Sequence, residues 1–283
     1  MIKIENLTFR YPDGTEALKE IQLRIKKGEF VALLGRNGSG KSTLLKHLNG
    51  LLQPSEGKVF VKGLDSSDNS NLLKIRQRVG LVFQNPTTQF VGTTLEEDVA
   101  FGPENLGLPS AEIRKRVDWA LAEVGLEAYK TRAPKTLSGG EQQGAALASV
   151  LALQPECLAL DEPTSMLDPE SRALFLRTLN KLWKRGQTLV YGTQRLEEIL
   201  SADRVIVMDR GKIVRQGKPK EVLKAANTST SGSEPGLKTF GLKLPPLIEL
   251  LNGLEAEGFF LDWKKIISNE SLAEEIWASL SKT

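Results

Sequence analysis

The chain has 283 residues, of which 40% are hydrophobic and 26% are charged, and these shares are typical of an ordinary soluble protein. Lys and Arg number 38 against 35 for Asp and Glu, and an excess of +3 is too small to indicate a nucleic-acid-binding surface. A single cysteine, Cys157, excludes an internal disulfide framework and fits a reducing compartment.

The first thirty residues predict an antiparallel sheet lobe. Residues 2–11 alternate between apolar and polar side chains, and residues 17–25 alternate again after the turn Pro12-Asp-Gly14. We expect Tyr11 to end the first strand. An aromatic ring there can stack on a purine, or it can simply be a partly buried strand residue, and the sequence favours neither.

A glycine-rich loop follows a short apolar run. Residues 30–34, Phe-Val-Ala-Leu-Leu, predict a strand buried on both faces, and a helix is expected from Thr43 onward. Between them stands Gly35-x-x-x-x-Gly40-Lys41-Ser42. Such a loop turns its N–H groups toward phosphate oxygens, and the helix N-terminus adds partial positive charge, so the sequence predicts a nucleoside triphosphate site. Lys41 can reach the β- and γ-phosphates, and Ser42 can bind Mg²⁺. The predicted nucleotide contacts are Gly35, Arg36, Asn37, Gly38, Ser39, Gly40, Lys41, Ser42 and Thr43.

The next part of the chain predicts two more strands. Residues 58–62 alternate, residues 64–70 read as a polar loop, and residues 79–83 form an apolar strand followed by Gln84. Ligands of open parallel sheets gather beyond the carboxyl ends of the strands. Gln84 is therefore a candidate contact for Mg²⁺ or for the attacking water.

Residues 87–155 change to helical periodicity, most clearly over residues 111–124. The polar segment Leu137-Ser-Gly-Gly-Glu leads into an alanine-rich helix predicted over residues 142–153. Ser138, Gly139 and Gly140 thus stand at a helix N-terminus. That position accepts phosphate, although a plain Ser-Gly cap explains the same pattern.

A buried strand, residues 157–160, ends in the two acids Asp161 and Glu162. Adjacent buried carboxylates need a partner. Asp161 suits the Mg²⁺ shell, and Glu162 can polarise a water for in-line attack on a γ-phosphate. A helix is expected over residues 169–183.

The remaining pattern predicts a strand at residues 188–191, a helical turn at 197–200, and a hairpin formed by residues 204–208 and 212–215. Residues 226–237 are polar and rich in Ser, Thr and Gly, which is typical of a linker. Residues 238–283 predict helices at 245–254 and 271–280, with aromatic residues for a small core: Phe259, Phe260, Trp263 and Trp277. So small an appendage is marginal alone, and we expect it to pack on the main domain or on a second copy.

Taken together, these motifs resemble the nucleotide-binding domain of an ABC transporter over residues 1–225. The matching segments occur in that family's order and approximate spacing: residues 35–42, Gln84, 137–140, 161–162 and 165–168. Leu137-Ser-Gly-Gly140 separates this family from other phosphate-loop enzymes. Residues 82–102, beginning Val-Phe-Gln-Asn-Pro, and the helix start Leu244-Pro-Pro246 resemble the ATPases of energy-coupling factor (ECF) transporters, which import vitamins or cobalt and nickel ions.

The resemblance implies an α/β fold: a phosphate-loop NTPase core with a mainly parallel sheet, an antiparallel β lobe, a helical subdomain at about 87–155, and a mainly helical C-terminal extension that contacts a dimer partner. It also implies ATP and Mg²⁺ as ligands and head-to-tail pairing with a second ATPase subunit, either a relative or a second copy. Each ATP would lie between one subunit's phosphate loop and the other's residues 137–140, and Tyr11 would stack on adenine.

Two positions depart from the family pattern. Gln194 stands where the family has a histidine that contacts the γ-phosphate, and glutamine donates a hydrogen bond but carries no proton. The only histidine, His47, lies after the phosphate loop and is expected to pack or to face solvent. Gly144 stands where the family commonly has an arginine after the signature segment, residues 137–140. Glu162 is retained, so the expected catalytic set is Glu162, Gln84 and Gln194, and the hypothesis is an unequal heterodimer with a slow site on this chain.

The leading interpretation is an ATPase that powers an ECF-type importer from the cytoplasmic face of the membrane. The chain shows no signal sequence and no apolar run of about 18 residues, so other chains are expected to hold it there. Its expected partners are a transmembrane coupling subunit and a substrate-capture membrane subunit, without nucleic acid. The alternatives are a soluble ABC ATPase and an ATP-binding switch with low turnover.

Overall fold

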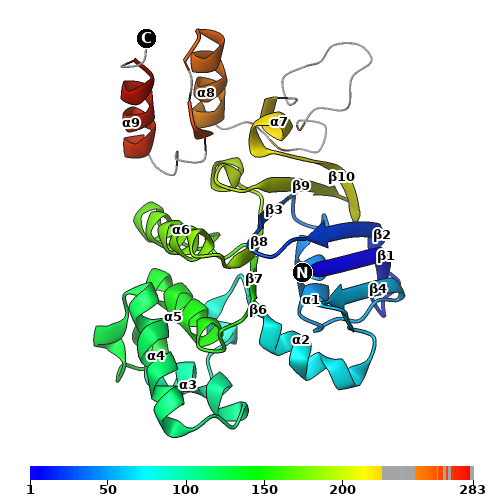
Figure 1. The fold of residues 1–283 in the computed structure, drawn as a ribbon, viewed down its shortest axis with the longest axis vertical. Helices are drawn as coiled ribbons and strands as arrows, with labels where there is room; N and C mark the ends of the chain where they lie inside the picture. The colour runs from blue at the N-terminus through cyan, green and yellow to red at the C-terminus, as the bar shows by residue number, and fades with distance from the viewer. Residues whose placement is uncertain are drawn as a thin grey trace.

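The computed structural model describes residues 1–224, 237, 242, 246–259, 261–263, 266 and 269–280. Two sheets organise this part of the chain (Figure 1). The smaller sheet is antiparallel, in the order β2-β1-β4-β5. Its strands are β1 (Ile2–Arg10), β2 (Glu16–Ile25), β4 (Glu56–Val61) and β5 (Leu64–Asp65). The predicted antiparallel lobe is confirmed.

The larger sheet has the order β10-β9-β3-β8-β7-β6 and is parallel except for its edge strand β10. Its strands are β3 (Phe30–Leu34), β6 (Val79–Val82), β7 (Cys157–Asp161), β8 (Thr188–Thr193), β9 (Arg204–Asp209) and β10 (Lys212–Gly217). Every residue of β3, β6, β7 and β8 is buried, as expected for strands covered on both faces. The carboxyl ends of these four strands meet at one edge of the sheet.

One apolar core fills the space between the two sheets around α1 (Lys41–Leu48). It takes Val31 and Leu33 from β3 and Leu44 and Leu45 from α1. His47 is fully buried in this layer and meets Phe9 edge to face at 4.7 Å between ring centroids. Of the two expectations for this histidine, packing is the one observed.

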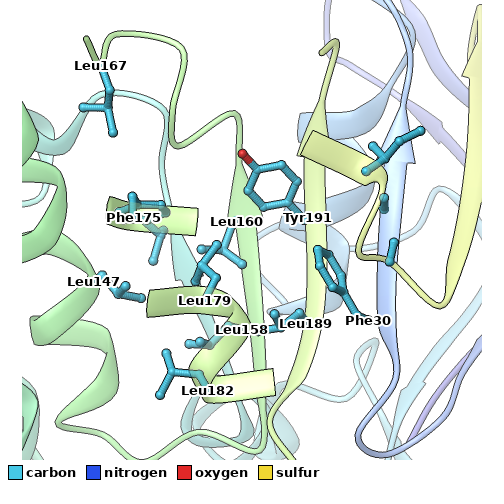
Figure 2. Packing of buried hydrophobic residues seen from close by; sticks show 14 of the residues in the cluster. Phe30, Leu147, Leu158, Leu160, Leu167, Phe175, Leu179, Leu182, Leu189 and Tyr191 are labelled. Carbon is cyan, nitrogen blue, oxygen red and sulfur yellow. The ribbon is translucent and has the colours of Figure 1, made fainter. Parts of the chain in front are cut away.

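A second core covers the opposite face of the large sheet (Figure 2). Leu158 and Leu160 of β7 and the fully buried Tyr191 of β8 face α6 (Pro169–Lys184). Leu147 reaches the same layer from α5 (Gly139–Leu151). Alternation of side chains along each strand thus builds both cores from one sheet.

Helices α3 (Leu95–Asn105), α4 (Ser110–Val124) and α5 lie within the segment 87–155 for which helical periodicity was predicted, and they are green in Figure 1. The sequence placed the start of α5 three residues too late, because its two glycines have low helix propensity. Ser138 compensates as N-cap: its hydroxyl accepts from Glu141 N–H while the Glu141 carboxylate accepts from Ser138 N–H.

Other local differences from the predicted elements are small. The short helix α2 (Leu72–Arg78) was missed, because Ile75 is its only buried residue and leaves no periodic signal. The loop predicted at 64–70 holds β5 and the beginning of a 3₁₀ turn. The single-turn 3₁₀ elements are η1 (Asn69–Asn71), η2 (Pro86–Thr88), η3 (Glu127–Tyr129), η4 (Pro134–Thr136) and η5 (Leu196–Ile199).

The C-terminal region contributes α7 (Pro219–Lys224), α8 (Pro246–Ala256) and α9 (Asn269–Leu280). Ile248, Leu251 and Trp263 are buried in the same apolar cluster as residues of α6. This region therefore packs onto the second core, on the face of the large sheet that α6 covers. Trp277 is 73% exposed, so its predicted place in a core is wrong, because α9 turns this side chain toward solvent.

Two sequence predictions fall on parts of the chain that are only partly described. Phe260 lies outside the described residues, as does the predicted linker 226–237 apart from Leu237. Among the helices of the described residues, none combines the length and apolar character that crossing a bilayer demands.

Candidate nucleotide site

The loop between β3 and α1 is held in a tight curve by backbone contacts. Gly40, the N-cap of α1, has φ +104°, and a Cβ there would lie 2.8 Å from the carbonyl oxygen of Ala17. Only glycine tolerates both conditions. The N–H of Gly211, in the β9–β10 turn, donates to Ser39 O at 3.0 Å and supports the loop from outside.

The inside of this loop presents donors to a bound anion. The first N–H groups of a helix have no acceptor in the preceding turn, and their partial positive charge favours a phosphate. The hydroxyl of Ser39 is buried and has no hydrogen-bond partner within the part of the chain that the structure describes. A buried donor that lacks a partner fits a phosphate oxygen at this place.

Lys41 is the cation at the centre of the site. Its side chain is 3% exposed, and Nζ donates to the carbonyl oxygens of Gly35 at 2.7 Å and Arg36 at 3.2 Å. Nζ also lies 3.0 Å from Oε1 of Glu162, whose side chain is 9% exposed. This buried ion pair places the predicted phosphate-binding lysine beside the predicted catalytic carboxylate.

Ser42 and Asp161 face each other across the start of α1 and the end of β7. The Ser42 hydroxyl donates to Asp161 Oδ1 at 2.8 Å. Burial raises the pKa of the Asp161 carboxyl, and the negative charge of Glu162 raises it further, while the Ser42 hydrogen bond lowers it. A cation at this position would favour the ionised form. Hydroxyl and carboxylate oxygens are the donors that Mg²⁺ prefers, so these two residues fit a magnesium ion.

Glu162 and Gln84 occupy the turns after β7 and β6. Glu162 has φ +43°, an uncommon value for a residue with a side chain, and its N–H donates to Gly192 O at 2.9 Å. Gln84 is exposed, and its Nε2 donates to the Ser165 hydroxyl at 3.2 Å. The amide of Gln84 is thus bound to the turn that follows Glu162.

An open cavity of ≈ 580 Å³ joins most of these residues. The predicted residues that line it are Tyr11, Asn37, Gly38, Ser39, Gly40, Lys41, Ser42, Thr43, Gln84 and Glu162. Gly35, Arg36, Asp161 and Gln194 do not line it. Lys19 and Arg210 also line this cavity, and sequence reasoning missed them. Only the meeting of β2 with the β9–β10 turn brings these two cations here, and no motif marks either residue.

Tyr11 lines the cavity and lies one residue beyond the end of β1, where the sequence predicted the last residue of the strand. Its hydroxyl is 3.0 Å from Thr43 Oγ1, and its ring meets Phe9 edge to face at 4.9 Å. These contacts fix the ring next to the phosphate loop. The position of the ring agrees with the prediction that Tyr11 stacks on a base.

Gln194 follows the last residue of β8 and is exposed. The chain just before it contacts both halves of the site: Thr193 O accepts from Gly35 N–H at 3.3 Å, and Gly192 O accepts from Glu162 N–H. Since β8 lies between β3 and β7, the backbone of Gln194 leaves the sheet between the phosphate loop, which follows β3, and Glu162, which follows β7.

The segment Ser138-Gly-Gly140 stands elsewhere in the molecule. It does not line the cavity at the phosphate loop, and a Cβ on Gly140 would lie 2.4 Å from the Ser171 hydroxyl, so glycine permits α5 to approach α6. A separate cavity of ≈ 230 Å³ lies beside Ser138, Gly140 and Gly144. The helix N-terminus at Ser138 is therefore separate from the cavity at the phosphate loop.

Comparison with known proteins gives consistent matches. Residues 18–165 match the ABC transporter family. The chain is 55% identical to the energy-coupling factor transporter ATP-binding protein EcfA of Methanosarcina acetivorans, with 100% of both chains covered. The solved structure of cbiO1 from Clostridium perfringens, described as part of the ABC transporter complex cbiONQ, has a TM-score of 0.74 at 37% identity and covers 89% of this chain and 98% of its own. A dimeric ATP-binding cassette in a post-hydrolysis state, bound to ADP and Pi, has a TM-score of 0.71 at 34% identity and covers 77% and 99%.

Proposed function

Because the chain belongs to the ABC transporter family, among the ATP-binding subunits of the energy-coupling factor type, we propose that its own site hydrolyses ATP to power an importer. One observation carries the assignment of residues: the phosphate loop, Gln84, Asp161-Glu162 and Gln194 follow four adjacent parallel strands at one edge of the sheet. Ligands of open α/β sheets bind at such an edge.

The reaction is phosphoryl transfer from ATP to water, which yields ADP and phosphate. The phosphate loop and Lys41 bind the β- and γ-phosphates. Ser42 and Asp161 would hold Mg²⁺, with Gln84 as a further ligand. When bound, Mg²⁺ neutralises negative charge on the β- and γ-phosphates. Glu162 accepts the proton of the attacking water as general base, and the Gln194 amide donates a hydrogen bond to the γ-phosphate.

Binding of ATP requires the Lys41–Glu162 pair to open. The 3.0 Å contact uses a cation that the γ-phosphate also needs, so ATP competes with Glu162 for Nζ. Once Lys41 turns to the phosphate, the Glu162 carboxylate is free to accept a proton. The ion pair thus keeps the general base occupied until substrate arrives.

A second ATPase subunit completes the arrangement. Ser138, Gly139 and Gly140 do not line this chain's own cavity, which suits a head-to-tail dimer in which residues 137–140 of each subunit close the partner's site. We further propose an unequal heterodimer, because Gln194 cannot carry a proton and Gly144 has no charge. Equal, rapid turnover at both sites of a purified homodimer would count against that inequality.

The transport partners lie in the membrane. We propose that the chain attaches to the cytoplasmic face through a transmembrane coupling subunit, in the groove near residues 84–101, and that a separate membrane subunit captures the vitamin or transition-metal ion. No residue of this chain then contacts the transported substrate, and the energy of ATP binding and hydrolysis reaches it only through subunit contacts.

The test is affinity purification of the tagged chain from detergent-solubilised native membranes, with every co-purifying chain identified. We expect a second related ATPase together with small apolar membrane proteins, and the capture subunit would reveal the class of substrate. Recovery of the chain only from the soluble fraction, alone or with nucleic acid, would refute the transport function.

A further inference from the structure

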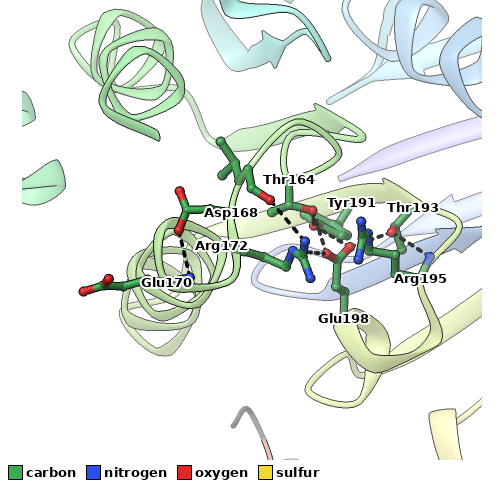
Figure 3. Close-up of polar contacts among 9 residues, drawn as sticks. Thr164, Asp168, Glu170, Arg172, Tyr191, Thr193, Arg195 and Glu198 are labelled. Atoms are coloured by element: carbon green, nitrogen blue, oxygen red, sulfur yellow. Dashed lines mark hydrogen bonds and ion pairs between the residues drawn. The ribbon is translucent and has the colours of Figure 1, made fainter. Parts of the chain in front are cut away.

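A buried carboxylate lies close to the site but has no part in the reaction described above. Glu198, in η5, is 6% exposed. Three hydroxyl groups donate to it: Thr164 to Oε1 at 2.6 Å, and Tyr191 and Thr193 to Oε2 at 2.9 and 2.6 Å (Figure 3). The guanidinium of Arg172 is nearby, with Nε 3.9 Å from Oε1, beyond hydrogen-bond distance.

The cluster supplies hydrogen-bond donors to both oxygens of the Glu198 side chain. A buried carboxylate needs charge-assisted hydrogen bonds to both oxygens, and Glu198 has them. Burial, and then the charge of Glu198, raise the pKa of Tyr191 well above its ordinary value, so the phenol stays protonated and donates. An apolar side chain of the same volume would fill this space without such requirements. The choice of a carboxylate points to a task other than filling the core.

Two of the three hydroxyl partners of Glu198, Thr164 and Thr193, lie next to the proposed catalytic groups in the chain, and Tyr191 comes from β8. Thr164 belongs to the turn that begins at Glu162, which Ser165 N–H closes by donating to Glu162 O at 3.1 Å. Thr193 immediately precedes Gln194, and its Oγ1 also accepts the N–H of Arg195 at 3.0 Å, on the other side of Gln194. One carboxylate therefore fixes both turns at once.

A third connection runs to the start of α6. Arg172 donates from Nη2 to Leu167 O at 3.1 Å, and Asp168 caps α6 by accepting from the N–H groups of Glu170 and Ser171 (Figure 3). The guanidinium thus lies between the Glu198 carboxylate and the loop at Leu167. The loop after Glu162 is held at both of its ends.

We propose that Glu198 is a positioning residue for ATP hydrolysis, which sets the turn of Glu162 and the turn of Gln194 in one mutual arrangement so that both side chains address the same γ-phosphate. This inference rests on the proposed function. The positive φ of Glu162 supports it, because an unfavourable backbone conformation persists only where surrounding contacts fix it. Misplacement of a catalytic group by about 1 Å lowers a rate about 100-fold.

The first variant is Glu198→Gln, which keeps the size of the side chain. Its carboxamide has one oxygen in place of two and no charge, so it cannot accept from all three hydroxyls. The phosphate loop stays intact. In the purified transporter complex we expect kcat to fall about 10- to 100-fold, while the Kd for ATP changes by less than about twofold. The control is Glu197→Gln, on the exposed side of the same turn, with kcat within about twofold of wild type.

A second pair of variants covers the case in which Glu198→Gln does not fold. Thr193→Val removes the hydroxyl at nearly constant volume, and Thr193→Ser restores it. We expect kcat to fall with valine and to recover in part with serine, at unchanged ATP affinity. In the Glu198→Gln background, Thr193→Val should lower kcat by a smaller factor than it does alone, because the contact is already broken.

Three results would overturn the inference. One is a Glu198→Gln complex with a kcat within twofold of wild type. Another is a loss that appears in ATP affinity instead of kcat. The third is a double variant, Glu198→Gln with Thr193→Val, in which the fold-loss in kcat equals the product of the losses in the two single variants. A wild-type complex that does not hydrolyse ATP would refute the proposed function itself and this inference with it, whereas an active wild type with an equally active variant refutes only the positioning role.

Discussion

Replacement of Glu162 by glutamine is the sharpest perturbation of the proposed site. The change keeps the shape of the side chain but removes its ability to accept a proton from water. General-base catalysis contributes about 100- to 10,000-fold to a rate, so we expect kcat for ATP hydrolysis to fall by about that factor. The measurement is steady-state phosphate release by the purified transporter complex at saturating MgATP.

The same change should act in the opposite direction on nucleotide binding. Glu162 pairs with Lys41 at 3.0 Å with both side chains buried, and ATP needs the same ammonium. Without the carboxylate, the γ-phosphate meets no competitor and no like charge, so the Kd for ATP should stay equal or become tighter. A fall in kcat together with weaker binding would indicate a damaged site instead of a lost base.

Without nucleotide, the variant should be less stable. Removal of one partner from a buried ion pair costs about 3–5 kcal/mol, and the carbonyl oxygens that remain around Lys41 place the loss near the lower end. For a chain of this size about 3 kcal/mol lowers Tm by roughly 5–10 °C. ATP should restore more of the Tm in the variant than in the wild type, since its phosphates replace the missing negative charge.

The control is Glu197→Gln, an exposed carboxylate whose loss should leave kcat and Tm nearly unchanged. The reasoning would be refuted by a Glu162→Gln complex that retains a kcat within about threefold of wild type. Such a result would mean that another group takes the proton, and the role given to the end of β7 would fall.

Three further predictions follow from single residues. Gln194→His should raise kcat about 3- to 10-fold and add a pH dependence near pH 6.5, because imidazole can hold a proton where the amide cannot; an unchanged rate and pH profile would contradict the role of Gln194. Burial raises the pKa of Asp161 above the ordinary carboxyl value near pH 4. Its contribution to the free energy of unfolding is therefore fully present below that ordinary value and is lost as the pH rises through the raised pKa. The affinity for MgATP should increase over the same pH window. Asp161→Asn should flatten both curves in a titration of Kd and urea midpoint against pH, and persistence of the slopes would assign them to another group. Gly40→Ala forces a side chain into φ +104° and within 2.8 Å of a carbonyl oxygen, so it should cost about 1–3 kcal/mol in denaturant unfolding and abolish ATP binding; normal binding would show that the loop has a different conformation.

The strand, glycine loop and helix start of the proposed phosphate site could be predicted from the sequence because these residues are local. Gly35 to Thr43 form strand end, loop and helix start within one stretch, and backbone geometry alone dictates the glycines. Asp161-Glu162 were found because charges directly after an apolar strand lack a structural reason. The parallel sheet then explains why such distant segments meet at one edge.

Residues brought together only by tertiary contacts gave no sequence signal. Lys19 and Arg210 reach the cavity from β2 and from the β9–β10 turn, and each reads as an ordinary surface cation. Glu198 lies on a short turn directly after a second glutamate, the exposed Glu197, and no sequence pattern distinguishes the buried member of this pair. Helix α2 was not predicted for a related reason, because its single buried residue leaves no hydrophobic periodicity to detect.

The end of the chain shows the limit of composition as a guide. Aromatic residues there predicted a small core, and Trp263 is indeed buried, but Trp277 lies on the solvent side of α9. Helical periodicity indicates which residues share a face, whereas the direction of that face depends on what the helix packs against.

The central claim is that the edge formed by β3, β8, β7 and β6 is an ATP-hydrolysing site that works within a membrane transporter. The most direct measurement is ATP hydrolysis by the complex purified from membranes, with the wild-type chain and with Lys41→Ala, after equal subunit composition of the two complexes has been established. We predict steady turnover for the wild type and at least a 100-fold loss for Lys41→Ala, because the cation that binds the phosphates is removed. Equal turnover by the two complexes would contradict the account, since the hydrolysis would then occur at a site that this chain does not supply.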